Sequence, residues 1–186
     1  MIKSKKLSKY KTVSHGFFDN KGGHSKGIYK SLNCGMGSSD NKKKVGRNLK
    51  VACQKISCSY EKLILLNQIH SNKFHFLNKN CKKNKEKLTG DALITNQKKI
   101  IIGVLTADCV PILIYDKNRQ IISAIHAGWK GVYKGIVKKV IKFLLEGGSE
   151  SKNLIATIGP CISQKSYEIK KDFKNLFLKQ SKKNEI

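Results

Sequence analysis

Residues 109–131 read CVPILIYDKNRQIISAIHAGWKG, and this stretch decides the fold. Its two apolar runs, Ile112–Tyr115 and Ile121–His126, are rich in β-branched residues and flank a polar break at Asp116–Gln120. Such runs on either side of a turn predict two antiparallel strands joined as a hairpin. We therefore expect a hairpin here that leads into the glycine-flanked segment after the second strand.

The register of this hairpin is expected to bring a thiol and an imidazole together. A loop centred between Lys117 and Asn118 places Cys109 directly opposite His126. Directly opposed residues have Cβ atoms about 4.5–5.5 Å apart on one face of a sheet, which suits two ligands of one metal or a thiolate beside its general base. Pro111 removes a ladder donor, so an edge, a bulge or a strand break is expected near Cys109.

Strand-like patterns recur outside the hairpin. Further strands are predicted at Thr12–Phe18, Lys62–His70, Phe74–Leu77, Asp91–Thr95, Ile100–Thr106 and Leu154–Ile158. Residues 78–87 are charged and polar, which predicts a surface loop. Helices and strands are interleaved without an internal repeat or a linker. The sequence therefore predicts one mixed α/β domain over residues 1–186, with a largely antiparallel sheet.

Three segments have helical periodicity. Asp40 is the expected N-cap of the first helix, whose apolar positions extend to Ile56. A second helix is predicted over residues 132–145, with one continuous apolar face that a pair of glycines ends. A last amphipathic helix is predicted around residues 173–177.

The chain is strongly basic, with a formal net charge of +26. Arginine occurs only at Arg47 and Arg119, so lysine supplies 36 of the 38 basic residues. Sequence-specific readers of nucleic acid rely on the bidentate arginine fork, which lysine does not reproduce. We therefore favour solvated lysines over a dedicated nucleic-acid surface, in a field that still attracts small anionic substrates.

The cysteines and the hydropathy pattern indicate a cytoplasmic protein. Six cysteines are spread without a paired framework, which favours catalytic, ligating or inert thiols in a reduced compartment over disulfides. No apolar run of membrane-spanning length occurs, and the lysine-rich start lacks the apolar stretch of a signal peptide.

Two imidazoles and one thiolate stand at the ends of strand-like runs. They belong to the phrases Gln68-Ile69-His70-Ser71, Ala107-Asp108-Cys109 and His126-Ala127-Gly128-Trp129-Lys130-Gly131. Two nitrogens and one sulfur form a ligand set that zinc accepts while a fourth position stays open. The alternatives are buried histidines and a small buried thiol. Asp108 either orients a ligating histidine or caps a turn.

The segment after His126 is the candidate anion site. Gly128, Lys130 and Gly131 stand where a strand passes directly into a predicted helix, and a helix N-terminus offers free amides to phosphate. The alternative is a plain strand-to-helix turn.

These motifs occur in an order that resembles the YfiH-like family, whose members are labelled polyphenol oxidase, bacterial laccase or purine nucleoside phosphorylase. Besides the three phrases above, the matching segments are His15–Phe18, Ser31–Gly35, Gly90–Thr95, Thr106–Pro111, Ile158–Ile162 and Tyr167–Glu168. The resemblance covers nearly the whole chain. Family members continue through a Ser-Tyr-Arg-Arg-like segment, whereas this chain stops at Ile186, so we expect a chain truncated at its C-terminus.

The resemblance implies a layered α/β/β/α sandwich, shared with a toxin deamidase that carries a cysteine–histidine pair. It also implies zinc bound by His70, Cys109 and His126. The implied activities are phosphorolysis of adenosine, inosine, guanosine and methylthioadenosine, together with deamination of adenosine. Purine nucleosides and phosphate are then the expected partners.

Several functions follow from these residues. The leading hypothesis is a zinc-dependent purine nucleoside enzyme. Its predicted catalytic residues are His70, Cys109, His126 and Asp108, and its predicted substrate- or phosphate-binding residues are Asp91, Gly128, Lys130 and Gly131. Asp91, Asp108 or His15 would supply the proton for the departing base. The second hypothesis is a cysteine-dependent amidase with Cys109 as nucleophile and His126 as base. The family resemblance implies editing of peptidoglycan precursors as the reaction of such an amidase.

Two further interpretations remain. A copper-dependent polyphenol oxidase would use copper in place of zinc, although five histidines are too few for a multicopper cluster set. A basic, non-enzymatic binding fragment is the last alternative.

Overall fold

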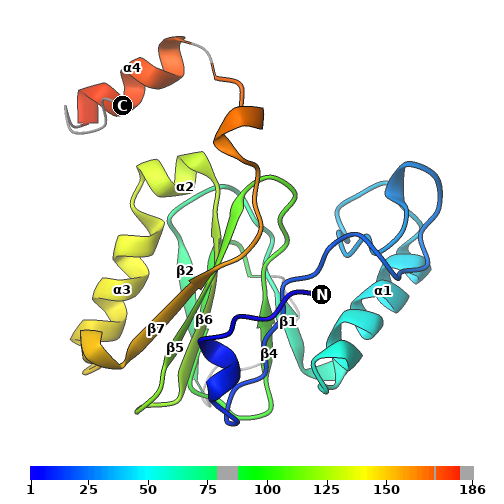
Figure 1. Cartoon of the computed structure of the whole chain (residues 1–186), viewed down its shortest axis with the longest axis horizontal. Helices are drawn as coiled ribbons and strands as arrows, with labels where there is room; N and C mark the ends of the chain where they lie inside the picture. Colours follow the sequence, from blue (N-terminus) through cyan, green and yellow to red (C-terminus); the bar gives the residue numbers. More distant parts are fainter. Residues whose placement is uncertain (79–87, 170, 181–186) are drawn as a thin grey trace.

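The computed structural model describes residues 1–78, 88–169 and 171–180 (Figure 1). Seven strands in this part of the chain form two sheets. The five-stranded sheet has the order β2-β3-β6-β5-β7, with bounds Phe74–Leu77, Ala92–Thr95, Ile121–Ala127, Val110–Asp116 and Leu154–Ile158. The smaller sheet pairs β1 and β4, with bounds Leu63–Leu65 and Ile101–Gly103.

The strand directions confirm the predicted mixed α/β class with a largely antiparallel sheet. The pairs β3–β6, β5–β6 and β5–β7 are antiparallel, whereas β2–β3 and β1–β4 are parallel. Short 3-10 turns separate several elements, at Leu7–Lys9, Gly27–Tyr29, Tyr60–Lys62, Ser151–Asn153 and Gln164–Ser166.

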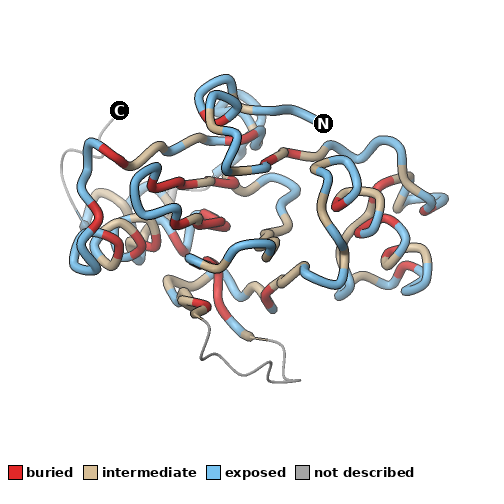
Figure 2. The backbone as a smooth tube through the Cα atoms, turned by 90° about the horizontal axis from the view of Figure 1, so that it is seen from below, coloured by how far each residue is buried: buried red, intermediate tan, exposed pale blue. Residues whose placement is uncertain are grey.

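The elements are layered around the large sheet. On one face, Ile136, Val140 and Leu144 of helix α3 (Ile136–Glu146) pack on alternate residues of the strands. On the other face, Leu93 packs against Leu66 and Leu77, with β1 and β4 contributing partly buried residues. Helix α1 (Lys42–Lys55) and α3 lie at opposite sides of the molecule with the strands between them (Figures 1 and 2). Figure 2 also places the buried stretches along the strands and the inner sides of the helices.

The N-cap of helix α1 (Lys42–Lys55) lies one residue later than predicted. Asn41 is the N-cap, because its side-chain oxygen accepts from the amides of Lys43 and Lys44. The prediction of Asp40 as N-cap was therefore wrong. The Asp40 carboxylate instead accepts from the Asn33 side chain and from the Asn41 amide.

The predicted single helix over residues 132–145 is two helices, α2 (Trp129–Tyr133) and α3. They are separated at Gly135, which has a φ of 75°. This left-handed conformation is open to glycine and breaks the helical path. The amphipathic face survives on α3 alone, because α2 runs in a different direction (Figure 1).

The predicted C-terminal helix is α4 (Lys171–Gln180), which lies beyond the sheet next to α2 (Figure 1). Its rings meet those of α2 edge to face. The ring centroids of Trp129 and Phe173 are 5.1 Å apart, and those of Tyr133 and Phe177 are 5.4 Å apart. Trp129 is therefore a packing residue against α4. No helix in the described ranges is long and apolar enough to cross a membrane.

The N-terminal region contains less strand than expected. In place of a strand over Thr12–Phe18, Phe17 forms one isolated bridge with Ile2. The predicted strand Lys62–His70 is limited to β1, since the chain turns away from β4 after Leu65. The predicted loop at 78–87 falls almost entirely outside the described residues.

The hairpin exists, but its register differs from the prediction by two residues. Asp116 pairs with Ile121, so the loop spans four residues and His126 lies opposite Pro111. The predicted direct opposition of Cys109 and His126 was therefore wrong. The Asp116 carboxylate selects the longer loop, because it accepts from the amides of Asn118 and Arg119.

Candidate metal centre

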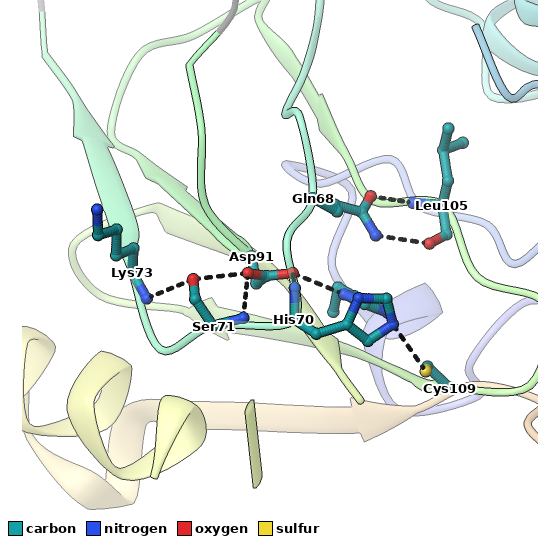
Figure 3. A network of polar contacts seen from close by, with 8 residues as sticks. Gln68, His70, Ser71, Lys73, Asp91, Leu105 and Cys109 are labelled. Atoms are coloured by element: carbon teal, nitrogen blue, oxygen red, sulfur yellow. Dashed lines mark hydrogen bonds and ion pairs between the residues drawn. The ribbon is translucent and has the colours of Figure 1, made fainter. Parts of the chain in front are cut away.

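Three ligand atoms from separate segments converge at one end of the strands. One atom each from His70, Cys109 and His126 lies within 4.8 Å of the other two. Figure 3 shows the His70 ring directed at the Cys109 sulfur. His126 is near the end of β6, Cys109 directly precedes β5, and His70 stands in the turn between β1 and β2. The set predicted from the sequence is thus brought together.

His70 has an unusual backbone. Its φ of 56° lies in the left-handed region, which is uncommon for a residue with a side chain. The conformation is held because the His70 amide donates to Asp91 Oδ1 at 2.9 Å. The exposed imidazole then lies edge to face on the ring of His126, and its Nε2 is 3.9 Å from Cys109 Sγ. Strain of this kind is characteristic of functional sites.

His126 is 3% exposed and has one tautomer imposed on it. Its Nδ1 donates to Asp91 Oδ1 at 2.9 Å. The proton therefore lies on Nδ1, which leaves the lone pair of Nε2 for a metal. A carboxylate behind a ligating histidine is the usual arrangement around zinc in proteins.

Asp91 is the centre of the hydrogen-bond network in Figure 3. The residue is fully buried, and its carboxylate accepts from the amides of His70 and Ser71, the Ser71 hydroxyl and the His126 ring. Burial alone would raise the pKa of Asp91, but these hydrogen bonds outweigh it and hold the pKa below its ordinary value. Asp91 is therefore a buried anion whose acceptor sites are directed at the ligand segments.

Cys109 is half-buried. Burial raises the pKa of its thiol, and the negative charges of Asp108 and Asp91 add to this effect. Such a thiol is protonated at neutral pH in the absence of a cation, whereas a coordinated zinc ion deprotonates it.

The space between the ligands fits one ion. Around tetrahedral zinc, neighbouring nitrogen and sulfur ligands are about 3.3–3.6 Å apart. The 3.9 Å between His70 Nε2 and Cys109 Sγ is close to this value. Gly128 borders the same space, because a Cβ at this position would come within 2.8 Å of His70 Cδ2 and 3.0 Å of Cys109 Sγ. The donor set thus suits a small tetrahedral ion, whose binding would draw together three atoms that lie within 4.8 Å of one another.

A family model described as multi-copper polyphenol oxidoreductase laccase matches residues 14–186. The chain belongs to this laccase family. A protein named purine nucleoside phosphorylase from Bacteroides thetaiotaomicron is 36% identical over 96% of this chain and 69% of its own length. One of the same name from Aquifex aeolicus is 41% identical over 66% of this chain and 56% of its own length.

Solved structures agree with the family membership. The hypothetical protein YfiH of Bacillus licheniformis matches with a TM-score of 0.78 and 25% identity, over 84% of this chain and 61% of that one. Protein NMB0706 of Neisseria meningitidis matches with a TM-score of 0.76 and 29% identity, over 88% and 64%. The layered α/β fold is therefore the one expected from the YfiH resemblance. This chain spans roughly half to two thirds of the length of several of these proteins, such as 49% of a Rickettsia conorii relative.

The remaining predicted site residues of this laccase-family chain are distributed around the ligands. Asp108 is exposed next to Cys109, and its carbonyl accepts from the Ile162 amide. Lys130 is exposed with its ammonium 5.5 Å from the Trp129 ring centroid. Gly131 is buried, and a Cβ there would be 2.9 Å from the Ser71 carbonyl.

His15 is tied to the N-terminal segment. Its Nε2 accepts from the Ser4 amide at 2.9 Å, and the residue is 7% exposed. Burial lowers the pKa of His15, and the nearby Lys3 charge lowers it further. His15 Nε2 is therefore already hydrogen-bonded within the N-terminal segment and is not directed at the metal ligands as a proton donor.

Two residues of the site were not assigned a role from the sequence. Ser71 connects the ligand turn to Asp91 through both its amide and its hydroxyl. Gln68 bonds with its side-chain amide to both backbone groups of Leu105. Both flank His70 in the phrase Gln68-Ile69-His70-Ser71, and their polar character at the end of an apolar strand was the available signal.

Proposed function

We propose that this chain is a zinc-dependent purine nucleoside phosphorylase that also deaminates adenosine. The observation that carries the proposal is the convergence of His70, Cys109 and His126 in a chain whose relatives are named purine nucleoside phosphorylase. Adenosine, inosine, guanosine and methylthioadenosine are the proposed nucleosides, with phosphate as the second substrate. A cytoplasmic setting suits the site, since the described cysteines are all free thiols.

Zinc is the proposed metal because the donors are two imidazoles and one thiolate with room for a fourth ligand. A multicopper oxidase needs many more histidines than the five in this chain. Two of the others are engaged elsewhere, since the ring nitrogens of His15 and His75 bond to backbone groups of Ser4 and Thr89. A copper-dependent polyphenol oxidase is therefore the weaker interpretation of the same ligand set.

The chain's own residues would hold the ion and fix its open side. His70 Nε2, Cys109 Sγ and His126 Nε2 would bind it, with the His126 ring held in its tautomer by Asp91. A bound zinc ion supplies Lewis-acid chemistry that activates water or polarises a substrate oxygen. The exposure of His70 leaves that side of the site open to a nucleoside.

Substrate contacts are proposed for the exposed residues beside the ligands. Lys130 is the proposed cation for phosphate, since it is exposed two residues beyond Gly128. Asp108, exposed beside Cys109, is the proposed proton donor for the departing base. Asp91 is expected from its sequence position to bind substrate, but its full burial and the four donors to its carboxylate favour a role in holding the ligands.

The test combines metal analysis with a nucleoside assay. Cys109→Ala should abolish zinc retention, and with it phosphate-dependent release of the base and deamination of adenosine. Asp108→Asn should keep zinc and lose phosphorolysis. Full phosphorolysis by Cys109→Ala would refute the assignment, as would an active parent protein without stoichiometric metal.

A cysteine-dependent amidase is the second candidate, and one geometric observation favours it. Cys109 Sγ lies within 4.8 Å of a ring nitrogen of His126, which Asp91 orients as in a nucleophile–base–carboxylate triad. Iodoacetamide labelling separates the two functions. Rapid labelling of Cys109 that a chelator leaves unchanged, without bound zinc, would favour the amidase; labelling that requires a chelator would favour the metal centre.

A further inference from the structure

The side chain of Gln68 makes a two-point contact with the segment that leads to Cys109. Gln68 Oε1 accepts from the Leu105 amide at 2.7 Å, and Gln68 Nε2 donates to the Leu105 carbonyl at 2.8 Å (Figure 3). Both atoms of the primary amide are therefore used, and both bonds have good length. The Gln68 side chain therefore offers the Leu105 backbone one donor and one acceptor, as a backbone residue of a neighbouring strand would.

This contact continues a strand pairing beyond its end. Strands β1 and β4 pair in parallel up to Leu65 and Gly103, after which the two segments separate. Leu105 lies two residues beyond that end, and Gln68 lies three residues beyond it on the other strand. In the described residues, no backbone–backbone hydrogen bond joins 66–71 to 104–109. Apart from the 3.9 Å contact between His70 Nε2 and Cys109 Sγ, the Gln68 amide is thus the hydrogen-bonded link between these two described segments past the sheet.

The two linked segments each carry a metal ligand. His70 follows Gln68 by two residues, and Cys109 follows Leu105 by four. On the other side of Gln68, the Asn67 backbone pairs with the segment that leads to Asp91. Within the described part of the chain, Asp91 fixes His70 and His126 but makes no hydrogen bond to Cys109. The pairing of Val110 with Ala127 and the hydrogen bond between the Ile162 amide and the Asp108 carbonyl hold Cys109 near His126, whereas the Gln68–Leu105 contact joins its segment to that of His70.

We propose that Gln68 is a positioning residue of the metal centre, whose amide sets the distance between the His70 ring and the Cys109 sulfur. The proposal rests on the metal site of the proposed function, but not on the identity of the substrate. Loss of the Gln68–Leu105 contact removes a restraint between the Cys109 segment and the His70 turn, while the pairing of Val110 with Ala127 still holds Cys109 near His126. The separation between the His70 ring and the Cys109 sulfur is then less well defined, so the thiolate binds a metal ion together with His70 less strongly.

Cobalt(II) binding to the whole chain tests this proposal, because cobalt reports its ligands by absorption. The variant is Gln68→Met, which keeps the length of the side chain and removes both hydrogen bonds. The matched control is Gln54→Met, an exposed position on α1. We expect Gln68→Met to bind cobalt about 10–100-fold more weakly than the parent. The thiolate-to-cobalt charge-transfer band per bound ion should also be reduced, whereas Gln54→Met should match the parent in both.

The outcomes separate this proposal from the metal site itself. A Gln68→Met protein with the parent's affinity and charge-transfer band would overturn the role of Gln68 and leave the metal site intact. A lower melting temperature with unchanged affinity and spectrum would also overturn it, since that is a purely structural effect. A parent without a thiolate band would refute both proposals. If Gln68→Met does not fold, Gln68→Glu, which retains the acceptor for the Leu105 amide, is held to the same criteria.

Discussion

Asp91 and His126 are joined twice. The His126 amide donates to the Asp91 carbonyl at 2.8 Å, and the His126 Nδ1 donates to the Asp91 carboxylate at 2.9 Å. The two residues extend the antiparallel pairing of β3 and β6, in which Ala92 lies opposite Ile125. Asp91 therefore fixes both the backbone of His126 and the tautomer of its ring.

Replacement of Asp91 by asparagine should weaken the metal site. The asparagine side chain would present an NH2 group to donors such as the Ser71 amide, and it would lack the negative charge that stabilises the His126 Nδ1–H. We expect zinc affinity, measured by competition with a chelator, to fall about 10–100-fold. Asp19→Asn, at an exposed carboxylate near the N-terminus, should leave the affinity unchanged. Equal affinities in both variants would contradict a supporting role for Asp91.

Replacement of Gly128 by alanine should disturb the ligands directly. The added Cβ would approach His70 Cδ2 to 2.8 Å and Cys109 Sγ to 3.0 Å, so both side chains would have to move. Overpacking of this kind costs about 1–3 kcal/mol, which corresponds to roughly 5–150-fold weaker zinc binding.

Gly46→Ala is the matched control for Gly128→Ala. Gly46 lies within α1, and a Cβ there meets nothing within 4 Å. This variant should keep the parent's zinc affinity and gain about 0.5–1 kcal/mol of unfolding free energy from the better helix former. A Gly128→Ala protein that binds zinc as tightly as Gly46→Ala would show that the ligand space is larger than the geometry indicates.

The sequence placed Cys109 and His126 on the same side of the sheet, although it predicted the wrong hairpin register. A shift of two residues leaves every side chain on the same face of the sheet, because strand side chains alternate with a period of two. Cys109 and His126 therefore stay on one side, although Pro111 takes the position opposite His126. The loop length itself depends on the Asp116 carboxylate, whose hydrogen bonds to loop amides compete with a tighter turn.

The convergence of the third ligand was not predictable from the local pattern. His70 reaches the site because its backbone is left-handed and held by Asp91, which directly precedes a strand that pairs with β6. Such contacts join residues far apart in sequence, so neither periodicity nor propensity encodes them. The motif phrases contain the three residues that converge, and the resemblance to a family supplied the grouping that spacing alone left open.

Zinc should stabilise the fold measurably. A ligand that binds the folded chain at a free concentration of 100 times its Kd adds about 2.7 kcal/mol. For a chain of this size, each kcal/mol raises Tm by about 2–4 °C, so a shift of roughly 5–10 °C is expected between chelator-treated and zinc-loaded protein. His126→Ala and Cys109→Ala should lose this zinc-dependent shift. A shift of the same size in both variants would indicate that zinc binds elsewhere.

Asp116 should contribute to stability in a way that acid removes. Burial alone would raise its pKa, but hydrogen bonds from the loop amides, first that of Arg119, outweigh this and hold the pKa below its ordinary value. As the pH falls, the unfolded chain then takes up the proton first, so the contribution is present at neutral pH and is lost below about pH 4. Asp116→Asn keeps an oxygen for the same amides and does not titrate. We expect it to cost about 1–2 kcal/mol at pH 7, since hydrogen bonds to a charged acceptor are the stronger ones.

Urea unfolding at pH 7, 5 and 3 measures this contribution. The difference in unfolding free energy between the parent and Asp116→Asn should be largest at pH 7 and pH 5, and it should shrink at pH 3 as the folded carboxyl takes up its proton. Glu146→Gln is the control, because Glu146 is 65% exposed and pairs with Lys142 across 3.5 Å at the surface of α3. Such an exposed pair contributes little, so its variant should follow the parent at every pH. A difference between the parent and Asp116→Asn that stays constant from pH 7 to pH 3 would mean that the charge of Asp116 does not stabilise the hairpin loop.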